Sequence, residues 1–249
     1  MPETICLLGV KVSRVNPVSA KEQIVRWVKQ GHRAYICVAP VSTLVDARRD
    51  PVYAAVINAA GMVTPDGMPV VWLAKAKGCS DVGRTYGPDL MRVLCRQEGL
   101  RHYFFGATSN VLEQLAQHLN KDFAGINIAG MVSPPFHPQA RMEDEGVIEV
   151  INKAKPDILW VALGSPKQDF WMQIHRSRLD VPVMIGVGAA FDFLAGAKPQ
   201  APRWMQAGGL EWLFRLCCEP RRLWKRYLIG NSLFVFYLIK DLFKGPAQL

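Results

Sequence analysis

The sequence predicts an α/β protein with a mostly parallel, Rossmann-like sheet flanked by helices. Short β-branched runs alternate with segments of helical periodicity over most of the 249 residues, and runs such as Ile158-Leu-Trp-Val-Ala162 are apolar throughout. Strands of continuous apolar residues are usually buried on both faces, and strand–helix alternation favours a parallel sheet covered by helices. The composition, 50% hydrophobic and 20% charged, is that of a globular protein.

The order of the elements follows from this alternation. We expect strands at residues 5–10, 34–38, 62–64, 102–106, 126–131, 158–162 and 183–187. Helices are expected at residues 19–28, 51–60, 88–98, 110–122, 142–153 and 166–177, the first opened by the capping box Ser19-Ala-Lys-Glu22. After residue 187 the pattern predicts no strand, only amphipathic helices at residues 210–217 and 221–243. We therefore predict an α/β domain over residues 1–197 and a basic, amphipathic helical appendage over residues 198–249.

Positive charge is concentrated in the predicted appendage. The net charge of the chain is +9, and residues 198–249 hold nine Lys/Arg against three acidic residues, with aromatic side chains between them. Such a segment suits an anionic partner (membrane headgroups, a diphosphate or nucleic acid), although a solvated basic face has the same composition. Its apolar stretch, residues 227–243, is interrupted by polar residues and falls short of the roughly 20 residues of a spanning helix. We expect the segment to lie on a membrane and not to cross it.

Cysteine and histidine usage indicates neither disulfides nor a metal site. The six cysteines show no CxxC spacing, the five histidines are scattered singly, and no DxD acidic pair is present. We expect reduced cysteines, no signal peptide, a cytoplasmic location and no metal or other cofactor.

Polar residues follow four of the predicted strands, where ligands bind in open α/β sheets. Asp66, between Pro65 and Gly67, fits either a general base or an ordinary turn or helix-capping residue. The turn Gly106-Ala-Thr-Ser-Asn110 fits either a phosphate cradle or a plain capped turn.

The two remaining strand ends also offer candidate ligands. In the segment Leu163-Gly-Ser-Pro-Lys-Gln-Asp169, Gly164 opens a turn, and Lys167, Gln168 and Asp169 lie at one helix start, which favours a ligand role. Asp192, between two phenylalanines, fits a ligand or a structural ion pair with Arg203.

Taken together, these segments resemble the WecG/TagA/CpsF glycosyltransferase family over nearly the whole chain. The matching stretches, in the order of the family, are Ala47-Arg-Arg-Asp-Pro51, Thr64-Pro-Asp-Gly-Met68, Arg84-Thr-Tyr-Gly-Pro-Asp-Leu90, Phe104-Phe-Gly106, Leu163-Gly-Ser-Pro-Lys-Gln168, Gly186-Val-Gly-Ala-Ala-Phe-Asp-Phe-Leu-Ala-Gly196, Ala201-Pro-Arg-Trp204, Gly209-Leu-Glu-Trp-Leu-Phe-Arg215 and Glu219-Pro-Arg-Arg222. The family makes β-linkages onto undecaprenyl-diphosphate-linked sugars of bacterial wall and surface polysaccharides.

The resemblance implies a metal-independent, inverting transfer from a UDP-sugar, a hexose or N-acetylhexosamine, to a polyprenyl-diphosphate-linked acceptor. Asp66 takes the place of the family's general base, and Gln168 that of a residue of the nucleotide-sugar pocket. The resemblance further implies that a C-terminal appendage docks on the inner face of the membrane and completes the site with cations. The expected substrate-binding residues are Thr43, Gly67, Arg84, Gly106, Gly164, Lys167, Gln168, Asp192, Arg203, Arg215, Arg222 and Lys225.

The chain departs from the family after its second predicted strand. Family members often have Thr-x-Asn there, whereas Ala39 and Val41 occupy these positions here, with Ser42 and Thr43 close by as possible substitutes. This departure suggests a subfamily with other sugars or, as an alternative, an inactive homologue. A second alternative is a nucleotide- or nucleic-acid-binding module without enzymatic activity. The tail, rich in Trp, Phe and Leu, suits a lipid surface better than nucleic acid, and a homo-oligomer remains open.

Overall fold

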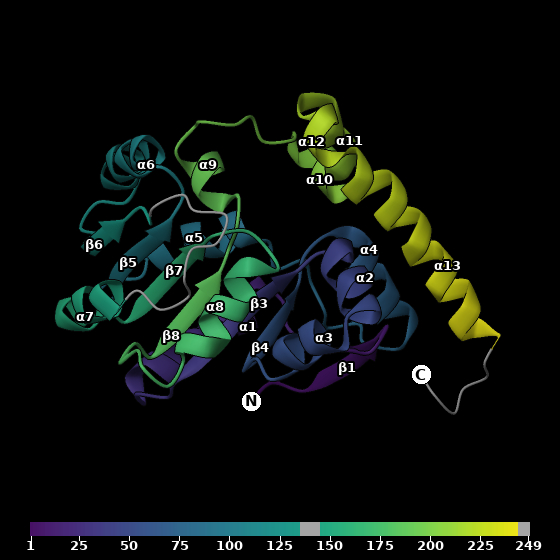
Figure 1. The fold of residues 1–249 in the computed structure, drawn as a ribbon, viewed down its shortest axis with the longest axis horizontal. Coiled ribbons are helices and arrows are strands. Elements are labelled where there is room, and N and C mark those ends of the chain that lie inside the picture. Colours follow the sequence, from purple (N-terminus) through teal and green to yellow (C-terminus); the bar gives the residue numbers. More distant parts are fainter. Residues whose placement is uncertain (135–144, 244–249) are drawn as a thin grey trace. The chain divides into compact units, whose positions relative to one another are not determined.

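The computed structural model describes residues 1–134 and 145–243 (Figure 1). Its main sheet has six strands in the order β4-β3-β8-β7-β5-β6, and the pairs β3–β8, β8–β7, β7–β5 and β5–β6 are parallel. The strands are β3 (Ala34–Ala39), β4 (Met62–Pro65), β5 (Arg101–Gly106), β6 (Asn127–Val132), β7 (Ile158–Ala162) and β8 (Val183–Gly186). The prediction of an α/β fold with a parallel sheet and flanking helices is confirmed.

The prediction of one strand over residues 5–10 is wrong. These residues belong to an antiparallel hairpin of β1 (Thr4–Leu7) and β2 (Val10–Ser13), which form a sheet of their own. The turn consists of Leu8 and Gly9, both with positive φ, 52° and 88°. Two central residues with positive φ match the twist of a tight hairpin, and glycine adopts this conformation without strain.

The chain packs as two compact units. The first contains Met1–Pro17, Val38–Tyr86 and Pro199–Leu249, and the second contains Val18–Cys37 and Gly87–Lys198. Residues 199–249 thus group with residues 38–86. The predicted boundary between residues 1–197 and 198–249 stays a prediction.

The second unit has a tightly packed apolar core. Its helices are α1 (Pro17–Lys29), α5 (Gly87–Cys95), α6 (Ser109–Asp122), α7 (Glu145–Ala154), α8 (Lys167–His175) and the short α9 (Ala190–Leu194), which was not predicted. The predicted helix 142–153 corresponds to α7, and its first three residues lie outside the described residues. On the sheet, Phe104 and Trp160 are fully buried, and Phe104 meets Phe191 of α9 edge to face, 5.6 Å between ring centres. These contacts explain why β5 and β7 read as apolar runs.

The first unit combines the N-terminal hairpin and β4 with helices from both ends of its sequence. They are α2 (Val41–Arg49), α3 (Pro51–Asn58), α4 (Met68–Ala76), α10 (Arg203–Ala207), α11 (Glu211–Cys218), α12 (Pro220–Trp224) and α13 (Gly230–Leu242). Helices α2, α4 and α10 were not predicted. A π-helical turn, Lys225–Ile229, joins α12 to α13, so the predicted helix 221–243 is present but not α-helical throughout.

Helix α13 lies along α2 within this unit (Figure 1). Arg48 of α2 forms a 2.9 Å ion pair with Asp241 and lies over the ring of Tyr237. Leu223 and Phe234 are buried, which fixes the inner face of the C-terminal helices. Over residues 1–134 and 145–243, none of the helices has the length and apolarity needed to cross a bilayer.

Candidate active site

The backbone at the end of β4 holds Asp66 at the edge of the sheet. Its N–H donates to the carbonyl of Ala39, at the end of β3, over 3.1 Å. Gly67 follows with φ of 90°, a conformation that favours glycine, and caps α4 without a side-chain hydrogen bond. The capping alternative for Asp66 is therefore wrong.

The surroundings of Asp66 favour a carboxyl group that titrates near neutral pH. Its side chain is only 18% exposed. Burial raises the pKa of Asp66 to about 6; Arg84 opposes this rise, Glu211 adds to it, and Arg215 and Arg226 oppose it. A carboxylate of this pKa accepts a proton more readily than an exposed aspartate and is still ionised at neutral pH.

Arg84 contacts four other polar or aromatic side chains. We call the five together the Asp66 cluster: Asp66, Arg84, Tyr86, Gln206 and Glu211. The guanidinium donates to Gln206 Oε1 over 3.0 Å and also to Glu211 Oε2. Its Nε lies 3.8 Å from Asp66 Oδ1, and its Cζ lies 4.0 Å from the centre of the Tyr86 ring. The Tyr86 hydroxyl donates to Glu211 Oε1 over 2.8 Å. The predicted residues Asp66 and Arg84 thus lie together.

Arg226 is a cation near Asp66 that the sequence did not single out. Its Nε and Nη2 donate to the Ser42 hydroxyl over 3.0 and 2.8 Å. Burial raises the pKa of both Asp66 and the partly buried Asp46, and the charge of Arg226 opposes that rise. Ser42 directly follows Val41, one of the two positions at which the chain departs from the family's Thr-x-Asn arrangement. Arg226 belongs to the π-helical turn, whose extra residue changes which side chains face α2, and helical periodicity gives no signal for such a turn.

The other cations expected from the resemblance lie in different surroundings. Arg222 makes two hydrogen bonds with Glu219, of 2.6 and 2.7 Å, and its side chain is 54% exposed. Lys225 lies over the ring of Trp224, 5.5 Å from its centre. Arg203 donates to Gln206 Oε1 over 3.1 Å, and so joins the rim of the Asp66 cluster.

Thr43, proposed as a substitute ligand, is buried in α2. It is 2% exposed, and its hydroxyl has no hydrogen-bond partner among the described residues. The hydroxyl of the neighbouring Ser42 accepts the hydrogen bonds from the Arg226 guanidinium.

In the second unit, Gln168 ties two strand-end turns together. Its Oε1 accepts from the N–H groups of Gly164, over 3.2 Å, and Gly188, over 3.0 Å, and its Nε2 donates to the Ser165 hydroxyl over 3.2 Å. Gln168 is 2% exposed, whereas Lys167 beside it is exposed. The amide thus shapes the turns after β7 and β8.

Two further candidates in this unit, Gly106 and Asp192, each have a structural role in the fold. Gly106 has φ of 123°, and a Cβ there would come within 2.5 Å of the Ala162 carbonyl, so packing alone requires glycine. The following helix is capped by the Thr108 side chain. Asp192 forms a 3.3 Å ion pair with Lys198, while the alternative partner named from the sequence was Arg203.

No three His, Cys, Asp or Glu side chains of the described ranges gather as a metal-ligand set. The expectation that the protein uses no metal or cofactor stays a prediction.

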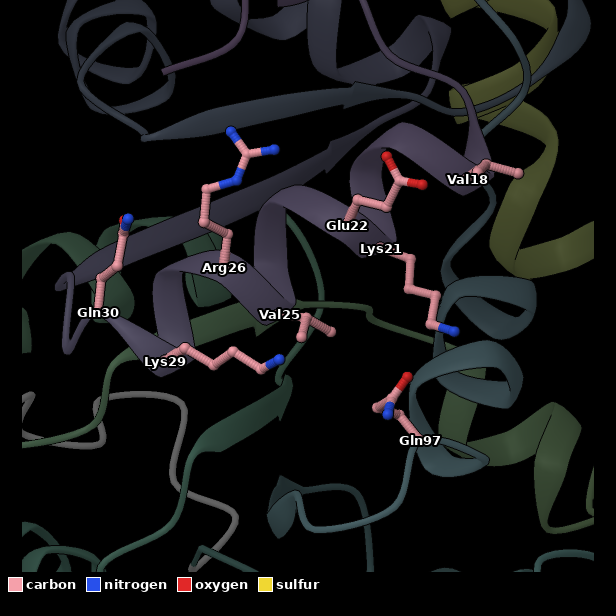
Figure 2. A pocket seen from close by; sticks show the side chains of 8 residues that line it. All are labelled: Val18, Lys21, Glu22, Val25, Arg26, Lys29, Gln30 and Gln97. Atoms are coloured by element: carbon pink, nitrogen blue, oxygen red, sulfur yellow. The ribbon is translucent and has the colours of Figure 1, made fainter.

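A surface pocket is present in the second unit (Figure 2). Six of its lining residues come from α1, and the other two are Gln30 and Gln97. Lys21, Arg26 and Lys29 give it a positive character. None of the predicted site residues lines it.

Comparison with known proteins defines the class of this protein. Residues 5–248 match the family described as "Glycosyl transferase WecG/TagA/CpsF family". A protein of Bacillus spizizenii named N-acetylglucosaminyldiphosphoundecaprenol N-acetyl-beta-D-mannosaminyltransferase is 32% identical over 81% of this chain and 77% of its own length. Proteins with the same name from Bacillus subtilis (30% identity, 73% of this chain and 70% of the relative) and Staphylococcus aureus (28%, 94% and 91%) are also similar.

The match covers nearly all of the chain, so the protein is a glycosyltransferase. More narrowly, it belongs to the WecG/TagA/CpsF family. The family resemblance expected from the sequence is confirmed.

Proposed function

We propose that this protein transfers N-acetyl-D-mannosamine, with inversion, from its UDP derivative to N-acetylglucosaminyl diphosphoundecaprenol. The choice of sugar and acceptor rests on the names of relatives with 28–32% identity. The observation that carries the mechanism is the Asp66 carboxyl group, largely buried, with a pKa of about 6, beside several cations.

In the proposed step, Asp66 acts as the general base. An acceptor hydroxyl attacks the anomeric carbon while its proton passes to the Asp66 carboxylate. The bond from the anomeric carbon to the diphosphate oxygen breaks on the opposite face, and UDP leaves with the bonding electron pair. One displacement inverts the anomeric centre, and a well-placed base contributes about 10²–10⁴-fold to the rate.

Cations of the first unit are proposed to neutralise the diphosphate. Arg215 and Arg226 both act electrostatically on Asp66, which supports this role. The resemblance assigns it to Arg215, Arg222 and Lys225, and all three assignments stay predictions. In the second unit, we propose that the turns held by Gln168, with Gly164 and Lys167, bind the nucleotide sugar. Gly106 and Asp192 stay predicted ligands.

We further propose that the C-terminal helices dock on the inner face of the cell membrane. Eight large apolar side chains there are well exposed, and we call them the apolar C-terminal face: Trp224, Leu228, Ile229, Val235, Phe236, Ile239, Leu242 and Phe243. Exposed apolar residues among basic ones are typical of helices that lie in a lipid interface.

The docking proposal is tested by co-sedimentation with phosphatidylglycerol vesicles. Each basic residue near an anionic bilayer contributes about 1 kcal/mol, so we expect binding to weaken as salt rises. Replacing Phe236 and Ile239 by Ser should reduce binding, while Val150→Ser, an equally exposed residue of α7, should not. Failure of the wild-type protein to bind would refute docking. Binding to duplex DNA and not to vesicles would instead favour the nucleic-acid-binding alternative.

The transfer itself is tested with a panel of UDP-sugars and a short-chain analogue of the lipid acceptor. Mass spectrometry should detect one added N-acetylhexosamine, and NMR of the product should show a β-linkage. Transfer from another donor would correct the sugar, and no transfer from any donor would favour the inactive homologue. Sedimentation velocity of the same sample determines the oligomeric state, which the sequence leaves open.

A further inference from the structure

Glu211, the first residue of α11, is a second carboxylate that shares Arg84 with Asp66. Its side chain is 16% exposed, and both of its oxygens are engaged. Oε2 contacts Arg84 Nη2, and Oε1 accepts from the Tyr86 hydroxyl over 2.8 Å. Glu211 is therefore held in place by two partners.

The guanidinium of Arg84 is directed toward Glu211 and away from full pairing with Asp66. Its Nη1 donates to Gln206 and its Nη2 contacts Glu211, so that both terminal nitrogens are engaged. Only Nε faces Asp66, at 3.8 Å, which is an ion-pair distance but too long for a hydrogen bond. The described residues donate no hydrogen bond to the Asp66 carboxylate, so its lone pairs remain available to an incoming hydroxyl group.

From this arrangement we infer that Glu211 is a positioning residue: it holds the Arg84 guanidinium off the Asp66 carboxylate and so leaves Asp66 able to accept the proton of the acceptor. The inference rests on the proposed function, because it assumes that Asp66 is the base. Without Glu211, the guanidinium is expected to turn to Asp66 and form a direct, charge-assisted pair, which weakens the base.

The charges that face Asp66 from the surrounding elements all enter this balance. Glu211 is the one acidic group among them that raises the pKa of Asp66, against Arg84 from the segment before α5, Arg215 from α11 and Arg226 from the π-helical turn. Tyr86 and Tyr227 are held neutral, since burial raises the pKa of both. Loss of the Glu211 charge should therefore lower the pKa of Asp66.

The first test is the pH dependence of kcat/KM for Glu211→Gln, which preserves the shape of the side chain. We expect the midpoint of the acidic limb to move down by about half a pH unit or more. A purely structural role for Glu211 would not move it. Glu113→Gln, an exposed residue of α6, serves as the matched control and should leave the profile unchanged. An unshifted midpoint in Glu211→Gln overturns the inference.

The second test asks whether Glu211 acts through Arg84. Glu211→Ala is expected to lower kcat about 10-fold or more, with KM changed less than about 3-fold. In an Arg84→Ala background, the same change should have little further effect, because residues that act through one another are not additive. Equal losses in both backgrounds would overturn the inference.

A third measurement separates this inference from the proposed function. The titration of the Asp66 carboxyl carbon by NMR needs no substrate. A downward shift of its pKa in Glu211→Gln supports the positioning role even if the wild-type protein transfers no sugar, and an unchanged pKa overturns it even in an active enzyme.

Discussion

Two turns that follow strands of this protein carry polar side chains that differ in how they are hydrogen-bonded. After β7, the Gln168 amide is buried and hydrogen-bonded to Gly164, Gly188 and Ser165. After β4, the Asp66 carboxylate receives no hydrogen bond from the described residues, and its nearest cation contact is 3.8 Å away. The comparison separates a side chain whose hydrogen bonds hold the scaffold from one that receives no hydrogen bond from the described residues.

The largest expected effect concerns the carboxylate. Asp66→Asn keeps the shape of the side chain but removes the base, so we expect kcat to fall about 10²–10⁴-fold. In the wild-type enzyme, kcat/KM should decline below pH 6, since the pKa of Asp66 is about 6 and the protonated form cannot accept a proton. Calorimetric UDP affinity should be retained in the variant, as in Asp122→Asn, an exposed control residue. Undiminished turnover in Asp66→Asn would show that Asp66 is not the base.

The next effect concerns the amide. Gln168→Ala leaves the N–H groups of Gly164 and Gly188 without their acceptor, and each unsatisfied buried group costs about 1–3 kcal/mol. We expect chemical denaturation to show a loss of about 2–4 kcal/mol, with a smaller loss for Gln168→Glu, whose carboxylate can still accept both bonds. A Gln168→Ala variant of native stability would show that the amide has no scaffold role.

Replacing Asp66 should also change the free energy of unfolding, in the opposite direction to replacing Gln168. Because the pKa of Asp66 is raised to about 6, from about 3.9 in an unfolded chain, its ionised form disfavours the folded state above pH 6. We expect Asp66→Asn to stabilise the protein by about 1–3 kcal/mol at pH 8. The gain should disappear below about pH 4, where the carboxyl group is protonated in both states. Destabilisation at pH 8 would mean that the nearby cations already compensate the charge.

The smallest expected effect distinguishes which cations neutralise the diphosphate. Arg226→Ala should lower kcat/KM about 10-fold, because Arg226 acts on Asp66 and is held at Ser42. Arg222→Ala should have less effect, because Arg222 is exposed and paired with Glu219. Initial rates at subsaturating donor compare the two. The reverse order would support the cations named from the family resemblance.

Much of the fold could be predicted from the sequence because it is encoded locally. Apolar runs located all six strands of the main sheet. The turn Pro65-Asp66-Gly67 made Asp66 a candidate, and the family resemblance assigned it as the base. The N-terminal hairpin was missed because its turn consists of Leu8 and Gly9, and leucine is not a typical residue at positive φ. Helix α2 was missed because its N-cap position is Pro40, which makes no side-chain cap hydrogen bond, so no capping residue marks its start.

The partners of the carboxylate could not be predicted in the same way. Gln206 and Glu211 lie 122 and 127 residues from Arg84 in the chain, so no local pattern links them. On an amphipathic helix, Glu211 and Arg226 look like any solvated charge. Only tertiary structure shows that they face the end of β4.

The π-helical turn at Lys225–Ile229 has a consequence for how the chain tolerates length changes. Bonding from residue i to i+5 accommodates one residue more than an α-helical turn, and each residue of an α-helix turns the chain by about 100°. Because the wider turn absorbs this extra residue, deleting one residue there would restore an α-helical turn and leave α12 and α13 in nearly the same rotational phase. The extra residue therefore affects mainly which side chains of the turn face α2, and Arg226, bonded to Ser42, is one of them.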